Sequence, residues 1–116
     1  MSHENFIRLV NDFCDVTGLD KPMRVVHGGP ISINRVIFSL IQKDNDLQRF
    51  FIYSDFGAFP KNSTTIAYQA LLAQNLFLYP DNGPVFAVSP ETGRALCISH
   101  YLVSEMNAQK LSQTFT

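Results

Sequence analysis

The segment from Ser63 to Asn75 constrains the fold more than any other, because it contains no charged residue. The polar run at 61–64 opens it, and the residues that follow predict an α-helix over roughly 63–75. A helix that is apolar nearly all round must be buried nearly all round. One sheet of a small chain covers only one side of such a helix, so the other side requires a second subunit. One apolar stripe consists of Ile66, Ala70, Ala73 and Phe77, and a second of Tyr68, Leu71, Leu72 and Leu76.

A hairpin that is apolar on both faces follows this helix. Pro90 fits a type I turn, and Gly93 supplies the left-handed residue of a longer hairpin loop. We expect the side chains on one face to be small as well as apolar, which suits close packing against a helix or another chain. That face is expected to hold Val85, Ala87, Ala95 and Cys97, and the other Phe86, Val88, Leu96 and Ile98.

Two further helices are predicted near the ends of the chain. Residues 3–17 have apolar side chains at helical spacing on one face, and Gly18 is placed to end that helix. Ser104 is a candidate cap for a last helix from about Glu105 onward. The stripe of the first helix consists of Phe6, Leu9, Val10, Phe13 and Thr17.

Strands are predicted between the first two helices. Met23–His27 is expected to form a short strand, and Arg35–Gln42 and Arg49–Asp55 pair as an antiparallel hairpin around the polar turn at 43–46. The resulting order is α-β-β-β-α-β-β-α. We therefore expect an α+β fold, with an antiparallel β-sheet flanked by helices in one domain over residues 1–116.

Composition excludes several classes of protein. The net charge is −1 and the nine Lys and Arg residues are scattered, which argues against a nucleic-acid-binding protein. No apolar run approaches the roughly 18 residues of a membrane span, and no signal peptide is visible. Cys14 and Cys97 lie in apolar settings without C-x-x-C spacing. We therefore expect a cytoplasmic protein with reduced, buried thiols and no membrane partner.

None of the candidate chemical groups forms the pattern of an active site. The histidines lack a metal-ligating neighbour at helical or strand spacing. A thiol–base pair of Cys97 and His100 is disfavoured, since residues three apart on a strand point to opposite faces. The acidic residues in turns are expected to stay solvated. We expect no catalytic residue, metal or cofactor among the groups considered, which are His3, His27, His100, Asp44, Asp46 and Asp81.

Two stretches, "LLAQNLF" at 71–77 and "GPVFAVSPETGRALCISHYL" at 83–102, together with the helix that follows, resemble the class I type III secretion chaperones of the Tir-chaperone-like family. The resemblance is good across roughly 63–112 and looser across the first half. It implies a small homodimer without enzymatic activity. Such a dimer binds the extended N-terminal segment of a secreted effector and keeps it competent for secretion, partly by strand addition at a sheet edge.

The resemblance also implies where the partners bind. The second helix and the late strands form the dimer interface, and apolar grooves near the first helix and the sheet receive the effector. The alternatives are a related regulatory or structural dimer that binds another protein, and a small enzyme. The expected interface consists of Ile66, Ala70, Leu72, Ala73, Leu76, Val85, Ala87 and Cys97, and the expected groove of Phe6, Leu9, Phe13, Val36, Phe38 and Phe51.

Overall fold

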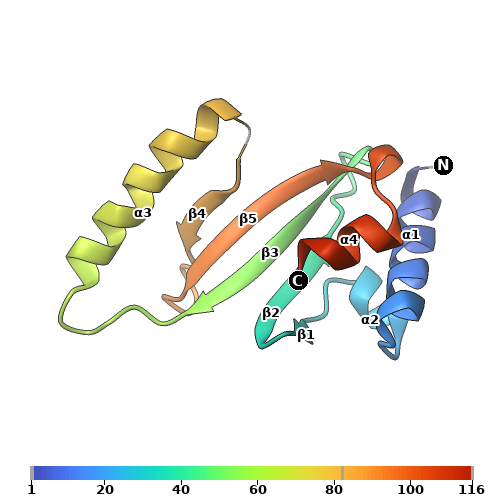
Figure 1. The fold of residues 1–116 in the computed structure, drawn as a ribbon, viewed down its shortest axis with the longest axis horizontal. Coiled ribbons are helices and arrows are strands. Elements are labelled where there is room, and N and C mark those ends of the chain that lie inside the picture. Colours follow the sequence, from blue (N-terminus) through green and yellow to red (C-terminus); the bar gives the residue numbers. More distant parts are fainter. Residues whose placement is uncertain (1, 82, 116) are drawn as a thin grey trace.

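The chain folds around one antiparallel sheet, with strands in the order β1-β2-β3-β5-β4 (Figure 1). The computed structural model describes residues 2–81 and 83–115. The α+β class and the flanking helices are as predicted. The helices are α1 (Ser2–Thr17), α2 (Pro22–Val26), α3 (Thr64–Leu78) and α4 (Ala108–Thr114), and the strands are β1 (Ile31–Ile33), β2 (Val36–Ile41), β3 (Arg49–Gly57), β4 (Val85–Val88) and β5 (Ala95–Leu102). Short 3₁₀ turns lie at Tyr79–Asp81 and Val103–Glu105.

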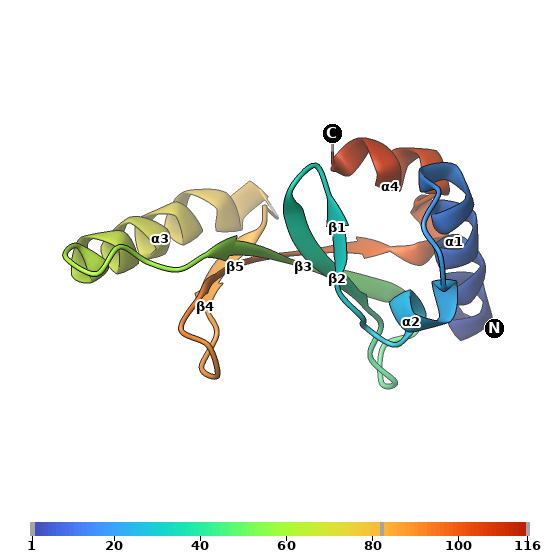
Figure 2. The ribbon, with the colours of Figure 1, turned by 90° about the horizontal axis from the view of Figure 1, so that it is seen from below.

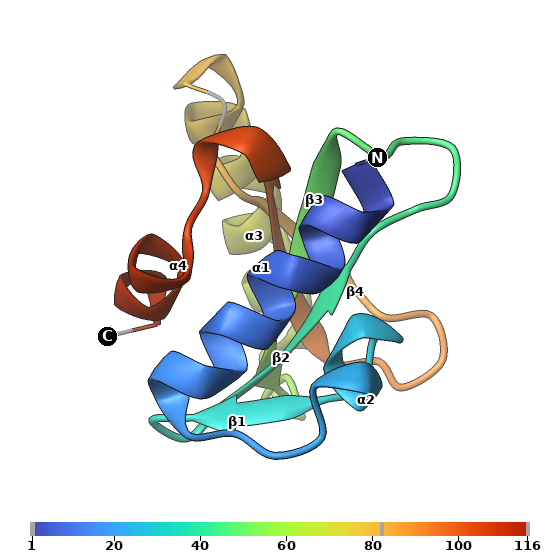
Figure 3. The same ribbon diagram turned by 90° about the vertical axis from the view of Figure 1, so that its right-hand side faces the viewer.

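The hydrophobic core lies between α1 and one end of the sheet. Phe6, Leu9, Val10 and Phe13 of the stripe predicted for the first helix are buried, and Thr17 is half-buried. Alternating residues of β2 and β3 meet the stripe from the other side. Figure 3 shows α1 crossing the sheet with α4 beside it. Phe115, which follows α4, stacks on Phe38 with 3.7 Å between ring centroids. The fully buried residues include Phe6, Val10, Phe13, Phe38, Leu40, Phe50, Ile52 and Leu111.

The strand predicted at Met23–His27 is wrong, because this segment forms the short helix α2. Pro22 begins the helix, where its fixed φ fits and its missing N–H costs nothing. Val25 and Val26 are buried in the core, and this burial overrides the β preference of valine. The first strand is instead Ile31–Ile33, which completes the three strands expected before α3.

The last helix begins later than predicted. Ser104 does not cap it, since it lies in the 3₁₀ turn that follows β5. The cap is Asn107, whose side-chain oxygen accepts a hydrogen bond from the Lys110 N–H at 2.9 Å. Asn107 lies three residues beyond Ser104, and the helix begins there because the chain leaves the sheet through the 3₁₀ turn at Val103–Glu105.

The α3–β4 unit, which we call the arm, projects from the rest of the molecule (Figure 2). The Cα radius of gyration is 15.1 Å, compared with about 13 Å for a compact domain of this length. The longest dimension is 44 Å and the shortest 25 Å. The elongation follows from the arm, since α1, α2 and α4 all pack at the opposite end of the sheet.

The turn between β1 and β2 yields a testable prediction. Asn34 and Arg35 form a two-residue hairpin with φ of 52° and 68°, a left-handed conformation that strains an arginine. Replacing Arg35 with glycine should remove this strain and raise the free energy of unfolding by roughly 0.5–1 kcal/mol. Urea denaturation at fixed protein concentration measures the change. Arg35→Ala is the control and should give no gain; a destabilised Arg35→Gly variant would contradict this account of the turn.

Candidate functional site: an exposed apolar helix and an uncovered sheet face

Helix α3 packs on the sheet through one narrow stripe. Ala67, Leu71, Asn75 and Leu78 recur at helical spacing and are half-buried, whereas no residue of the helix is fully buried. The stripe faces β4, which is the last strand of the sheet. Most of the helix surface is therefore left without cover by its own chain.

Asn75 fixes the helix to the sheet by two hydrogen bonds. Its side-chain amide donates to the Phe86 carbonyl at 3.0 Å, and its side-chain oxygen accepts from the Phe86 N–H at 2.6 Å. A carboxamide offers one donor and one acceptor in the way that a neighbouring strand would. Asn75 therefore blocks the outer edge of β4 at this residue. In the sequence, Asn75 is a polar residue of an apolar helix and part of the stretch LLAQNLF, and its position one turn before the helix end was the available signal for this contact.

The uncovered side of α3, which we call the α3 face, is strongly apolar. Leu72 is 68% exposed and Leu76 is 72% exposed, and the helix carries no charged residue. Leucine side chains left this open are disfavoured in water by about 1.5–3 kcal/mol each relative to burial. The α3 face consists of Ile66, Tyr68, Leu72, Leu76, Phe77 and Tyr79.

The total surface area also indicates that the chain leaves an unusually large area uncovered. The accessible surface of the chain is 7880 Å². A compact monomer of 13.1 kDa is expected to expose roughly 6,400 Å², so the excess is about 1,500 Å². A standard protein interface buries about 800 Å² on each partner. The excess is therefore large enough to supply more than one interface.

The register of the β4–β5 hairpin corrects the predicted faces. Val85 lies opposite Ile98 and Phe86 lies opposite Cys97, and residues directly opposite each other share a face. Val85 and Ala87 therefore share a face with Leu96 and Ile98, while Cys97 lies on the other face. The prediction failed because alternation along each strand does not determine how two strands align. The turn itself is as predicted, with φ of 72° at Gly93.

An ion pair holds this hairpin against β3. The Nε–H of Arg94 donates to both carboxylate oxygens of Asp55, at 3.1 and 3.0 Å. The Gly57 N–H also donates to Asp55, at 2.8 Å, where the pairing of β3 with β5 is irregular. The hydrogen bond from Arg94 lowers the pKa of the Asp55 carboxyl below its ordinary value. These contacts link the turn that carries β4 to the centre of the sheet.

The face of the sheet opposite α1, which we call the outer sheet face, is also apolar. Its apolar residues on β2 and β3 are Ile37, Ile41, Phe51 and Tyr53, none of which is fully buried, and Ser39 and Asp55 lie on the same face. Lys43 Nζ lies 5.2 Å from the centroid of the Phe51 ring, and Arg49 Cζ lies 5.3 Å from it. The outer sheet face therefore combines apolar side chains with a cationic border.

The predicted groove residues do not share one open surface. Phe6, Leu9, Phe13 and Phe38 lie in the core, closed to solvent. Val36 is partly exposed but lies on the same face of β2 as Phe38, whereas Phe51 lies on the outer sheet face. The large apolar residues of α1 suited a core as well as a groove, and packing against the sheet placed them in the core.

Within residues 2–81 and 83–115, no group of three or more acidic, histidine or cysteine residues is placed to hold a metal ion. Both cysteines are free thiols, and burial raises the pKa of each. Among the described helices, none is long and apolar enough to cross a membrane. The surfaces that stand out are apolar ones suited to binding.

One protein family matches nearly the whole chain. The profile of the Tir chaperone protein (CesT) family aligns with residues 9–116. No curated protein sequence matches the chain.

Several solved structures share the fold at low sequence identity. A chain in the crystal structure of the ExsC–ExsE complex aligns with a TM-score of 0.72 and 14% identity, covering 96% of this chain and 83% of that chain. One in the HopA1–SchA chaperone–effector complex aligns with a TM-score of 0.72 and 18% identity, covering 97% and 86%. One in the structure of the Yersinia pestis type III secretion chaperone SycH with a stable fragment of YscM2 aligns with a TM-score of 0.65 and 16% identity, covering 91% and 86%.

The role of Asn75 can be tested by removing its side chain. Asn75→Ala eliminates both hydrogen bonds to Phe86 and should lower the free energy of unfolding by about 1–3 kcal/mol. The Phe86 amide should also lose protection against hydrogen exchange, which NMR or mass spectrometry measures. Gln74→Ala is the matched control, because Gln74 is an exposed neighbour on the same helix. Equal protection of the Phe86 amide in both variants would show that Asn75 does not hold β4.

Proposed function

The chain belongs to the Tir chaperone protein (CesT) family, and we propose that it acts as a type III secretion chaperone in the bacterial cytoplasm. It binds the extended N-terminal segment of a secreted effector and keeps that segment competent for secretion. It does so without ATP and without catalytic turnover. The structurally similar chains come from complexes that include a chaperone with its effector and a type III secretion chaperone with a protein fragment.

The observation that carries this proposal is the amount of apolar surface that the chain leaves uncovered. Chaperones of extended segments need such surface, whereas an enzyme needs converging polar groups in a cleft. The excess of about 1,500 Å² over a compact monomer is divided between the α3 face and the outer sheet face. The α3 face serves self-association, and the part of the outer sheet face on β2 and β3 serves the effector.

The α3 face is the proposed dimer interface. Burying Ile66, Leu72 and Leu76 against a second copy would contribute roughly 5–9 kcal/mol before the entropic cost of association is subtracted. Val85 lies opposite Ile98, and Ile98 lies opposite Tyr53, so Val85 and Ala87 belong to the β4 end of the outer sheet face. The proposed interface continues from α3 onto that end. Cys97 lies on the other face of the hairpin, where its thiol is half-buried. The proposed interface residues on the helix also include Ala70 and Ala73, whose small side chains allow close approach.

The outer sheet face and the edge of β1 are the proposed effector-binding surface. Phe51, Ile37 and Tyr53 provide apolar contacts, and an extended segment adds main-chain hydrogen bonds at a sheet edge. The sheet has two edges, and Asn75 occupies the β4 edge at Phe86. The β1 edge is therefore the one proposed for strand addition. In a dimer, two copies of this surface act on one polypeptide and raise its overall affinity.

The dimer is tested by placing a charge on the α3 face. Leu72→Asp puts an unpaired carboxylate into the proposed interface, which costs several kcal/mol and should give monomer or aggregate. Light scattering should report twice the 13.1 kDa chain mass for the unsubstituted protein at micromolar concentration. Leu47→Asp makes the same chemical change at an exposed leucine in the loop between β2 and β3 and should remain dimeric. An unsubstituted chain that is monomeric at this concentration would refute the proposed dimer.

Effector binding is tested by co-expression with the first part of a secreted protein encoded nearby in the genome. About 100 residues are used, because their extended length of about 330 Å is enough to wrap around a dimer whose subunits are 44 Å long. We expect a complex of two chaperone chains and one segment, with the segment unfolded when alone. Binding only to a folded partner would favour the regulatory or structural alternative, and hydrolysis of a small molecule would favour an enzyme.

A further inference from the structure

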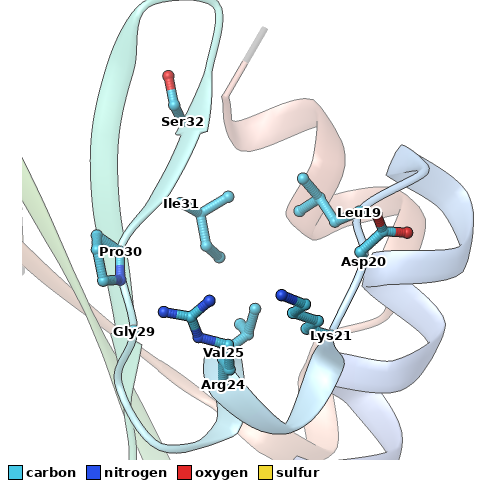
Figure 4. Close-up of a pocket in the computed structure, with 9 residues that line it drawn as sticks. All are labelled: Leu19, Asp20, Lys21, Arg24, Val25, Gly29, Pro30, Ile31 and Ser32. Atoms are coloured by element: carbon cyan, nitrogen blue, oxygen red, sulfur yellow. The ribbon is translucent and has the colours of Figure 1, made fainter.

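A small pocket lies between α2 and the free edge of β1 (Figure 4). Its volume is about 240 Å³. Leu19, Val25 and Ile31 form its apolar wall, and Val25 and Ile31 are buried. The remaining lining residues are Asp20, Lys21, Arg24, Gly29, Pro30 and Ser32.

Two cationic side chains point into this pocket. Figure 4 shows the Lys21 ammonium and the Arg24 guanidinium directed into the space between α2 and β1. Among the residues that the structure describes, neither cation has a carboxylate within ion-pairing distance. Asp20 lines the same pocket, and its carboxylate is directed away from both cations in Figure 4. The pocket therefore holds two unpaired positive charges beside an apolar wall.

This combination favours a carboxylate ligand. Arginine binds a carboxylate through two parallel hydrogen bonds, and lysine adds a point charge from the other side. An apolar wall excludes water from one side of the ion pair and so strengthens the attraction. Neither α2 nor the loop before β1 contains an acidic residue, and Asp20 is directed away from both cations, so a carboxylate held here would be that of a bound partner.

The free edge of β1 determines which part of a partner reaches the pocket. In a two-residue hairpin, the residues flanking the turn form a hydrogen-bonded pair, here Ile33 with Val36. Bonded and non-bonded pairs alternate, so the Ser32 N–H and C=O point away from β2 toward the open edge. Pro30 has no N–H to offer. A strand that adds to this edge is therefore anchored at Ser32.

The side chains of such a strand alternate between the two faces of the sheet. The residue beside Ser32 points to the outer sheet face, which also carries the exposed Ile37 one strand further in, beyond the small Ser32 side chain. The next residue points to the face of Ile31, which is the side of the pocket. Adjacent residues of the partner therefore meet an apolar contact and the two cations.

We propose that the pocket binds an aspartate or glutamate side chain of the effector segment that pairs with β1. The recognised feature is an acidic residue directly beside an apolar residue in an extended segment, with the acid held between Lys21 and Arg24 and the apolar residue reaching over Ser32 toward Ile37. This inference rests on the proposed function and adds the chemistry of the segment that is bound.

The test uses the full-length chain and the effector segment that co-purifies with it. Replacing both cations, as Lys21→Gln with Arg24→Gln, keeps the side chains polar and of similar length but removes the charge. Calorimetric titration should show affinity for the segment lowered by about ten- to a hundred-fold, the size expected for loss of a partly desolvated charge pair. Lys61→Gln, which removes an exposed charge in the loop before α3, should bind like the unsubstituted chain. Matching thermal midpoints establish that all three proteins are folded.

A reciprocal scan identifies the acid. Each Asp and Glu of the segment is changed singly to Asn or Gln and titrated against both the unsubstituted chain and the double variant. One substitution should weaken binding to the unsubstituted chain and leave binding to the double variant unchanged, which is the signature of a direct pair.

The outcomes separate the two proposals. Undiminished affinity of the double variant would overturn the acidic-residue pocket and leave the chaperone function intact. Failure of the unsubstituted chain to bind any such segment would overturn the chaperone function together with this inference. Inorganic phosphate is titrated as a further arm: tight phosphate binding at α2, with no effect of any carboxylate substitution, would overturn the proposal in favour of a phosphate site.

Discussion

The pair of hydrogen bonds between the Asn75 amide and the Phe86 backbone fixes where α3 lies on the sheet, and so which side of this helix stays exposed. An uncharged helix such as α3 would otherwise bury as much apolar surface as its own chain allows. Asn75 ties it to the outer edge of β4, so only the stripe of Ala67, Leu71 and Leu78 is covered. The same bonds satisfy the backbone of an edge strand. One side chain therefore closes an edge and leaves the α3 face pointing outward.

Burial is divided unevenly between the two ends of the sheet. The largest fully buried side chains, among them Phe6, Phe13 and Phe50, all lie in α1, α4 and the strands they cover, whereas α3 has none. The end of the sheet that α1 covers therefore has a core of its own, while the α3–β4 arm leaves much of its apolar surface exposed. A protein built in this way gains stability when a partner covers the arm, because a ligand that binds only the folded state stabilises it.

The two edges of the sheet, β4 and β1, differ in how open they are to pairing with an added strand. The β4 edge is occupied by Asn75 at Phe86, and the β1 edge is short, carries Pro30 and borders a pocket with two cations. In the proposed function, strand addition therefore takes place at the β1 edge, away from the α3 face. Self-association and partner binding can then occur together, as a chaperone that wraps one segment around a dimer requires.

Local signals in the sequence determined much of this protein by themselves. The stripe of α1, the β2–β3 hairpin, the left-handed Gly93 and the absence of charge in α3 depend on neighbours within a few positions, so each is evident from the amino-acid order alone. Tertiary structure decided the rest. Val25 and Val26 became helical because the core buried them, and Val85 came opposite Ile98 because strand register depends on a second strand. Phe6 and Phe38 lie in the core and not in a groove. An apolar side chain suits either place, so only the packing of α1 on the sheet distinguishes the two.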